Sequence, residues 1–166
     1  MTVLTAVDGE TTPSEAVERG AELASALEVE HIVLHVMPQD TFEEFRSAAG
    51  SGSSGAVTSP ASYGGNDSRP TGEGDSYTIE DGERHATGVA REVVRDTLDN
   101  PDETVLMGRV GEPVEELLAE ADRREADYLV IGGRKRSPTG KALFGSKTQS
   151  ILLSANRPVV AVMSEN

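Results

Sequence analysis

The chain has 166 residues, of which 29 are acidic and 15 are basic, and it contains no cysteine. This length is typical of one domain. The lack of cysteine excludes a disulfide scaffold and a thiolate metal site, and the formal charge of -14 disfavours binding to nucleic acid or to an anionic membrane. Only three of the basic residues are lysine, and concentrated salt screens the self-repulsion of so acidic a protein. We therefore expect a halophilic, salt-accumulating cytoplasm; the alternative is an ordinary acidic cytosolic protein.

Strand and helix signals alternate from the start of the chain. The run Thr2 to Val7 is apolar and β-branched and ends at Asp8-Gly9, which predicts a short buried strand. Thr12-Pro13-Ser14-Glu15 supplies an N-cap, a proline at the first helical position and a glutamate at the third, so a helix should follow. The run His31 to Met37 predicts a second strand and completes a right-handed βαβ unit. The N-terminal sequence carries no export or membrane-insertion signal, so we expect a cytoplasmic protein.

The composition changes in the middle of the chain. Residues 47–76 are rich in glycine, serine and proline and lack apolar periodicity, which predicts a flexible insertion within a single domain spanning 1–166. Helical periodicity then returns in a stripe made of Ile79, Ala86, Val89, Ala90, Val93, Val94 and Leu98. Thr104 to Met107 predicts a third strand, after which Gly108 to Pro113 is expected to be a loop that leads into a helix.

The segment from Tyr128 to Val162 predicts a strand, a loop, a helix and a last strand. Its first apolar run stops at Gly132-Gly133, and the helix is expected to begin near Gly145-Ser146. Five short strands separated by helical patterns predict an α/β fold with an open, doubly wound parallel sheet and helices on both faces. In such folds ligands bind at the carboxyl ends of the strands, so the loop after Gly132 is the first candidate for function.

The charge of this loop is opposite to that of the chain. From residue 134 to residue 147 there is no acidic residue, and five basic residues occur there: Arg134, Lys135, Arg136, Lys141 and Lys147. Positive charge, glycines that admit a ligand to the backbone, and free amides at a helix N-terminus together indicate an anion site, most often for phosphate. The alternative is a solvated loop that balances acidic charge elsewhere on the surface.

The spacing of the glycines resembles that of the universal stress protein family, whose nucleotide-binding members carry G-x2-G-x9-G-[S/T] at this junction. Gly132, the nine-residue spacer and Gly145-Ser146 match, whereas Lys135 stands where the family has its second glycine. The resemblance implies that Gly132, Gly145 and Ser146 hold the phosphates of ATP. Lys135 either costs strain, if its position needs a positive φ, or reaches a phosphate itself.

The same resemblance covers nearly the whole chain outside the insertion and includes the stretch GRVGEPVEELL at 108–118. It implies a Rossmann-like sheet with the strand order 3-2-1-4-5, in which Asp8 faces the Gly132 loop. It also implies that Asp8 contacts the adenosine part of the nucleotide and that Val36 lines the adenine pocket, although Asp8 alone could be a turn residue. The full expected binding set is Ala6, Val7, Asp8, Val36, Ile131, Gly132, Lys135, Gly145, Ser146 and Lys147.

The expected function is therefore that of a regulatory protein that binds ATP or a related nucleotide, with or without Mg²⁺, between the first and fourth strands. We also expect a homodimer formed through residues 157–162, because that strand is a sheet edge in the family order. No nucleophile and base stand at a suitable spacing, so no catalytic residue is expected and any ATP hydrolysis should be slow. His31 and His35 lack a carboxylate partner for a metal site. The alternative function is a scaffold that binds no nucleotide and acts through dimerisation and protein partners.

Overall fold

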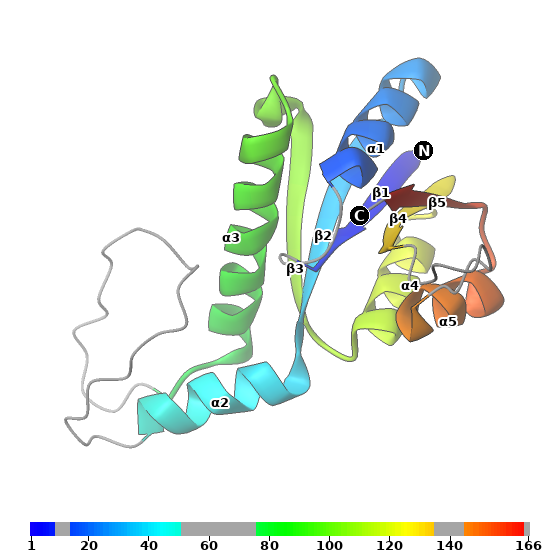
Figure 1. Ribbon diagram of the computed structural model, residues 1–166. Helices are drawn as coiled ribbons and strands as arrows, with labels where there is room; N and C mark the ends of the chain where they lie inside the picture. The colour runs from blue at the N-terminus through cyan, green and yellow to red at the C-terminus, as the bar shows by residue number, and fades with distance from the viewer. Residues whose placement is uncertain (9–13, 51–75, 135–144, 165–166) are drawn as a thin grey trace.

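The computed structural model describes residues 1–8, 14–50, 76–134 and 145–164. Its strands form one five-stranded parallel sheet in the order β3-β2-β1-β4-β5, which confirms the expected fold (Figure 1). The elements in chain order are β1 (Thr2–Val7), α1 (Ser14–Leu27), β2 (Glu30–Pro38), α2 (Gln39–Gly50), α3 (Ile79–Thr97), a short 3₁₀ helix (Pro101–Glu103), β3 (Thr104–Gly111), α4 (Pro113–Arg123), β4 (Tyr128–Arg134), α5 (Ser146–Ser154) and β5 (Val159–Ser164).

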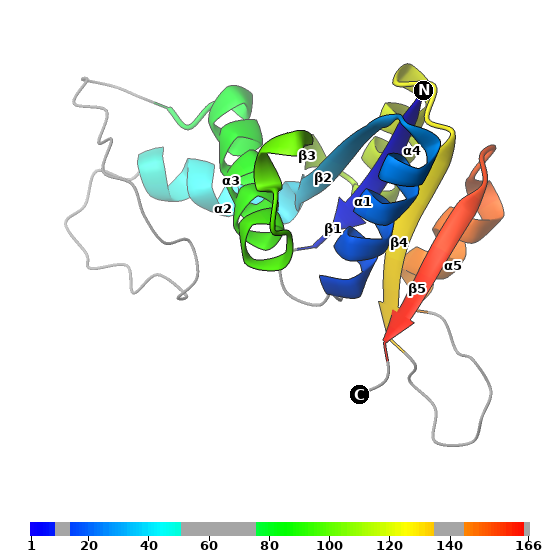
Figure 2. The same ribbon diagram turned by 90° about the horizontal axis from the view of Figure 1, so that it is seen from above.

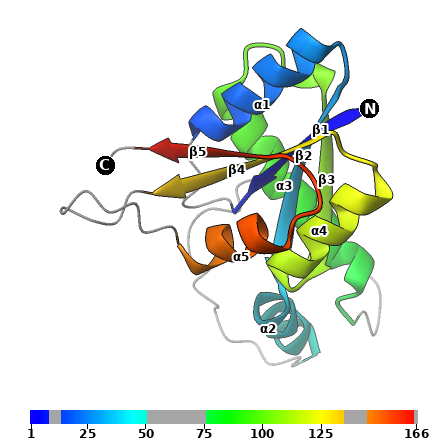
Figure 3. The ribbon, with the colours of Figure 1, turned by 90° about the vertical axis from the view of Figure 1, so that its right-hand side faces the viewer.

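Helices cover both faces of the sheet, with α1 and α3 on one side and α4 and α5 on the other (Figure 3). The core on the α4/α5 side contains Ile32 and Leu34 of β2, together with Leu117 of α4 and Ile151 of α5. On the opposite side Val33 packs with residues of α1 and α3. Because β2 is buried on both faces, its sequence is a continuous apolar run rather than an alternating one. No helix in the described part of the chain is long and apolar enough to cross a membrane.

Two helices contact the sheet at glycines. A Cβ atom on Gly20 of α1 would lie 2.1 Å from Thr5 Oγ1 and 2.7 Å from His31 Nε2. A Cβ atom on Gly108 of β3 would lie 2.2 Å from the carbonyl oxygen of Glu83 in α3. Because glycine has no side chain, the backbones of α3 and β3 can meet directly at Gly108.

Three segments differ from the expectations drawn from the sequence. Residues 47–50 belong to α2 rather than to the insertion, and two alanines there favour a helix; residues 51–75 lie outside the described part of the chain. Gly108 to Gly111 continue β3 instead of forming a loop, because β2 extends beside them and Pro38 still pairs with Gly111. Likewise, β4 continues through Gly132-Gly133 to Arg134, where β5 supplies a partner. The length of the neighbouring strand, rather than the local sequence, therefore sets where β3 and β4 end.

An aromatic cluster joins α2 to the first turns of α3. The ring of Phe45 lies 5.6 Å from that of Tyr77 and 4.9 Å from that of His85, and the ring of Phe42 lies 5.5 Å from that of Tyr77. The Tyr77 hydroxyl is also 3.2 Å from His85 Nδ1. The sequence predicted at most a short helical turn at the two phenylalanines, whereas they anchor a helix of 12 residues.

Candidate functional site

The carboxyl end of β1 is the switch point of the sheet. Pairing of β1 with β2 ends at Val7 and His35, and pairing of β1 with β4 ends at Ala6 and Ile131. Beyond these pairs β2 continues beside β3, and β4 continues beside β5. The first strand therefore stops while both of its neighbours go on, and Asp8 follows directly at that position. The switch point is thus the end of β1, flanked by β2 and β4.

The side chains around the switch point separate onto the two faces of the sheet. Val36, Ile131 and the partly buried Ala6 all belong to the core on the α4/α5 side. Val7 instead packs with Val17 of α1 on the opposite face. Asp8 is exposed. Of the four apolar residues in the expected binding set, three thus share one face and Val7 does not.

The first turn of α5 lies beside the end of β4. A Cβ atom on Gly133 would be 3.8 Å from Thr148 Oγ1, which places that turn next to the glycine pair of β4. Gly145 is the N-cap residue of α5, with extended backbone angles of φ -59° and ψ 153°. Since glycine has no side chain that could cap the helix, the first amides of α5 depend on another acceptor. An anion is the natural acceptor at such a helix N-terminus.

The pKa of His35 in β2 responds to its burial and to charged groups that follow β1 or belong to α3 and α5. Burial lowers the pKa of His35 below its usual value. The hydrogen bond to Val7 and the charge of Asp8 act in the opposite direction, whereas the charges of His85 and Lys147 lower the pKa further. Asp8 after β1 and Lys147 in α5 are therefore both close enough to influence one imidazole. A carboxylate thus follows β1, and a lysine lies in the first turn of α5 at the same carboxyl edge of the sheet.

The structure places half of the expected binding set, its polar residues and glycines, at one edge of the sheet. Asp8, Gly132, Gly145, Ser146 and Lys147 all lie at the carboxyl edge of the sheet, at the end of β1, near the end of β4 or in the first turn of α5. Lys135 lies outside the described residues. His35 was missed as a site residue, because a histidine in an apolar run is read as a packed side chain; its register opposite Val7 becomes visible only when β1 and β2 are paired.

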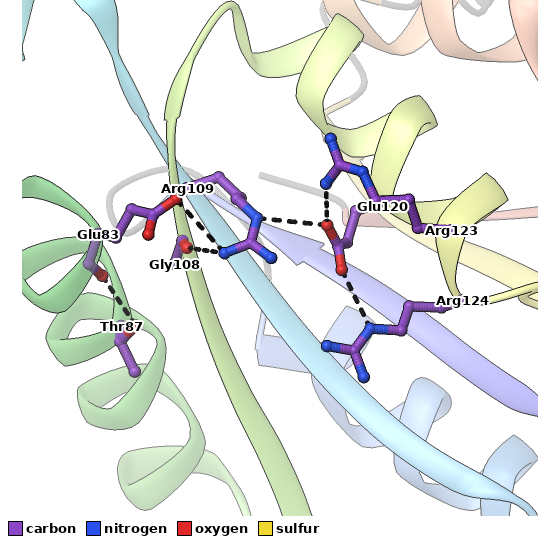
Figure 4. A network of polar contacts seen from close by, with 7 residues as sticks. All are labelled: Glu83, Thr87, Gly108, Arg109, Glu120, Arg123 and Arg124. Carbon is purple, nitrogen blue, oxygen red and sulfur yellow. Dashed lines mark hydrogen bonds and ion pairs between the residues drawn. The ribbon is translucent and has the colours of Figure 1, made fainter. Parts of the chain in front are cut away.

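A second polar cluster lies between α3, β3 and α4 (Figure 4). The side chain of Glu120 is 1% exposed and pairs with Arg109, Arg123 and Arg124, while Arg109 Nη1 also lies 3.4 Å from Glu83 Oε1. Burial raises the pKa of Glu120, but the three guanidinium groups outweigh this and lower it overall. Every cation here already has a carboxylate partner, so the cluster is best understood as a structural clamp. The sequence signals only its i,i+3 and i,i+4 pairs within α4.

The described residues contain no group of three or more histidine, aspartate or glutamate side chains that could hold a metal ion. The parallel sheet, its strand order and the helices on both faces define a doubly wound, Rossmann-like α/β protein. The chain belongs to the universal stress protein family, which it matches over residues 1–163.

Individual relatives agree with this assignment. A universal stress protein from Mycolicibacterium smegmatis is 52% identical over 48 residues, a match that covers 29% of this chain and only 37% of that protein. The solved structure of a universal stress protein from Archaeoglobus fulgidus is 25% identical, with a TM-score of 0.57 and 98% of each chain covered. A universal stress protein solved in complex with cAMP has a TM-score of 0.60 at 20% identity, covering 98% of this chain and 96% of that one.

Proposed function

We propose that this chain binds ATP or a related adenine nucleotide at the switch point and acts as a regulatory protein rather than as an enzyme. The observation that carries the proposal is that Asp8, directly after β1, and Lys147, in the first turn of α5, lie at the same carboxyl edge of the sheet. The carboxylate can accept hydrogen bonds from ribose hydroxyls, and the ammonium group and helix amides can bind phosphate oxygens. That a structurally similar family member was solved with cAMP supports the choice of an adenine nucleotide.

The direct test is calorimetric titration of the purified protein with ATP, cAMP and GTP in 2 M and 0.2 M KCl. We expect heat of binding with the adenine nucleotides in at least one of the two buffers. If neither buffer gives any heat of binding or any thermal shift, the nucleotide proposal fails. It would favour the alternative, a scaffold that acts through protein partners.

A pair of charge variants localises the site. Lys147→Gln removes the ammonium group from the first turn of α5 and should weaken ATP binding about tenfold, as expected for one charge-assisted contact. The matched control is Arg95→Gln, which removes an exposed cation from the last turn of α3, at the opposite edge of the sheet. Equal effects of the two substitutions would indicate a general response to charge instead of a contact at the switch point.

We also propose that bound nucleotide is not turned over at a useful rate. The sequence offers no nucleophile and base at a helical or strand spacing that would do acid–base or covalent work on the nucleotide. Incubation with ATP should release phosphate no faster than a heat-treated sample does. Saturable phosphate release that Asp8→Asn abolishes would contradict this part of the proposal.

A homodimer through residues 157–162 completes the proposal. β5 is a sheet edge (Figure 2). Each of its residues is only partly buried in the single chain. The carbonyl oxygen of Pro158 accepts a hydrogen bond of 2.9 Å from the Leu129 amide of β4. The amide and carbonyl groups of successive residues point in opposite directions along a strand, so those of Val160 and Val162 also point toward β4. The amide and carbonyl groups of the residues between and beside them point away from β4: Val159, Ala161 and Met163. These outward groups are available to pair with a second copy.

A further inference from the structure

His35 makes one hydrogen bond that bears directly on the switch point. Its Nδ1 atom lies 2.9 Å from the carbonyl oxygen of Val7, and the residue is 5% exposed. A carbonyl oxygen can only accept, so the proton of this bond is carried by Nδ1. Burial lowers the pKa of the imidazole, which keeps the ring neutral near pH 7.

The acceptor of this bond belongs to the peptide unit that leads into Asp8. Val7 is the last residue of β1, and its carbonyl lies in one plane with the amide of Asp8. Fixing the direction of the Val7 carbonyl therefore fixes the direction of the Asp8 amide and the starting point of the Asp8 side chain. β1 has reached the end of its ladder here, so a side chain performs the orienting role that strand pairing performs earlier in the strand.

We propose that His35 is a positioning residue, which holds the Val7-Asp8 peptide in the orientation needed for nucleotide binding at the switch point. The inference rests on the proposed function, since it assigns His35 a role in that same site. His35 acts through Asp8 and need not touch the ligand. It differs in this respect from Lys147, whose ammonium group is assigned to direct contact with phosphate.

His31 provides a matched comparison on the same strand. It is also 5% exposed and lies on the same face of β2, four residues earlier. Its ring nitrogens contact the hydroxyls of Thr5, at 2.9 Å, and Thr104, at 3.3 Å, near the opposite end of the strands. Loss of either ring removes a buried hydrogen bond, but of the two only the His35 bond ends on the peptide before Asp8.

The experiment compares His35→Leu, His35→Asn and His31→Leu. An asparagine amide can place a donor near the position of Nδ1, whereas leucine cannot donate. The first measurement uses the protein without ligand: the amide resonance and backbone order of Asp8 by NMR. We expect a large change at Asp8 in His35→Leu, little change in His35→Asn, and none in His31→Leu.

The second measurement is ATP affinity in a double-mutant cycle with Asp8→Asn. His35→Leu should weaken binding about tenfold in the wild-type background and hardly at all in the Asp8→Asn background, because both changes disable one contact. His35→Asn should bind within about threefold of the wild type, and His31→Leu should bind equally well. Losses that simply add, or equal losses from His31→Leu and His35→Leu, would overturn the positioning role.

The two measurements separate this inference from the proposed function. If the wild-type protein binds no nucleotide, the proposed function fails, and the Asp8 resonance alone decides whether His35 orients the end of β1. If the wild type binds ATP and the Asp8 resonance is unchanged in folded His35→Leu, the positioning role is wrong while the proposed function stands. Should His35→Leu not fold, His35→Gln replaces it: its longer side chain moves the donor away from the Nδ1 position, so the same loss of affinity is expected.

Discussion

Replacing Gly108 by alanine should destabilise the protein, because β3 and α3 meet backbone to backbone at that residue. The added Cβ atom would lie 2.2 Å from the Glu83 carbonyl oxygen and 2.4 Å from the Thr87 amide nitrogen, whereas ordinary contact begins at 3.4 Å. Neither atom can rotate away, because both belong to the backbone of a helix. The helix must therefore retreat from the strand by about 1 Å, which loosens the surrounding packing.

The magnitude follows from two opposing effects. Overpacking of a well-filled contact costs about 1–3 kcal/mol, and replacing glycine within a strand returns about 0.5–1 kcal/mol of conformational entropy. We expect a net loss of about 1–2 kcal/mol for Gly108→Ala. Gly88 in α3 is the control, because a Cβ atom there meets nothing within 4 Å. Gly88→Ala should stabilise the protein by up to about 1 kcal/mol, since alanine is the better helix former.

The assay is urea unfolding followed by circular dichroism, with all proteins at one concentration and one salt level so that association and screening are constant. The unfolding midpoint should fall for Gly108→Ala and rise for Gly88→Ala, with unchanged slopes. If Gly108→Ala were as stable as the wild type while Gly88→Ala gained stability, the contact between α3 and β3 would have room that the structure does not show. The proposed reason for glycine at 108 would then be wrong.

Three further predictions test other parts of the molecule. Burial lowers the pKa of His31 from 6.5 to about 4, so the unfolded chain binds the proton more readily between these values. The free energy of unfolding should therefore fall as the pH drops from about 6.5 to 4, and His31 should contribute at most about 1.4 kcal/mol per pH unit to this fall. His31→Gln should make the dependence on pH less steep, which urea titrations at several pH values would measure. Ala161→Pro removes an outward-pointing amide of β5 and leaves the hydrogen bonds between β5 and β4 intact, so it should yield a monomer in light scattering. Ala161→Thr keeps that amide and should give a dimer. A dimeric Ala161→Pro protein would show that the β5 edge is not the dimer interface. If Lys135 contacts phosphate, which is the role we favour, Lys135→Gly should weaken ATP binding by about 1 kcal/mol or more in calorimetry. If Lys135 instead blocks the loop, the same substitution should tighten binding. An unchanged affinity would reject both roles of Lys135.

The strands and their order could be anticipated, but several of their ends could not. The apolar, β-branched run Thr2 to Val7 predicted β1 with the ends that the structure gives it, and the order of the strands came from the family resemblance. Gly108 to Gly111 contains little that favours a strand, yet it pairs with β2 because that neighbour extends far enough. Whether a weak segment becomes a strand depends on the reach of a partner distant in sequence, which local patterns do not encode.

The candidate site was anticipated unevenly for a similar reason. Gly145 and Ser146 carry a recognisable spacing, and Asp8 gains meaning because it directly follows a predicted strand. The role of His35 depends on a hydrogen bond across 28 residues of sequence, and that of Glu120 on an arginine in another element. Both roles arise from pairings between elements, so they become visible only when the fold is known.

Arg109, which belongs to the edge strand β3, affects how copies of the chain can assemble. The guanidinium of Arg109 contacts Glu83 of α3 on one face of the sheet and Glu120 of α4 on the other, at the edge formed by β3 (Figure 4). A strand from another molecule that added to this edge would have to displace a charged side chain held by two carboxylates, and edge strands are commonly protected by such charges. Of the two sheet edges in the described part of the chain, only that of β5 lacks such a charged clamp, and two copies joined there by a twofold axis, as proposed, would leave no edge for a third. The proposed dimer would therefore be a closed pair that does not grow into a fibre.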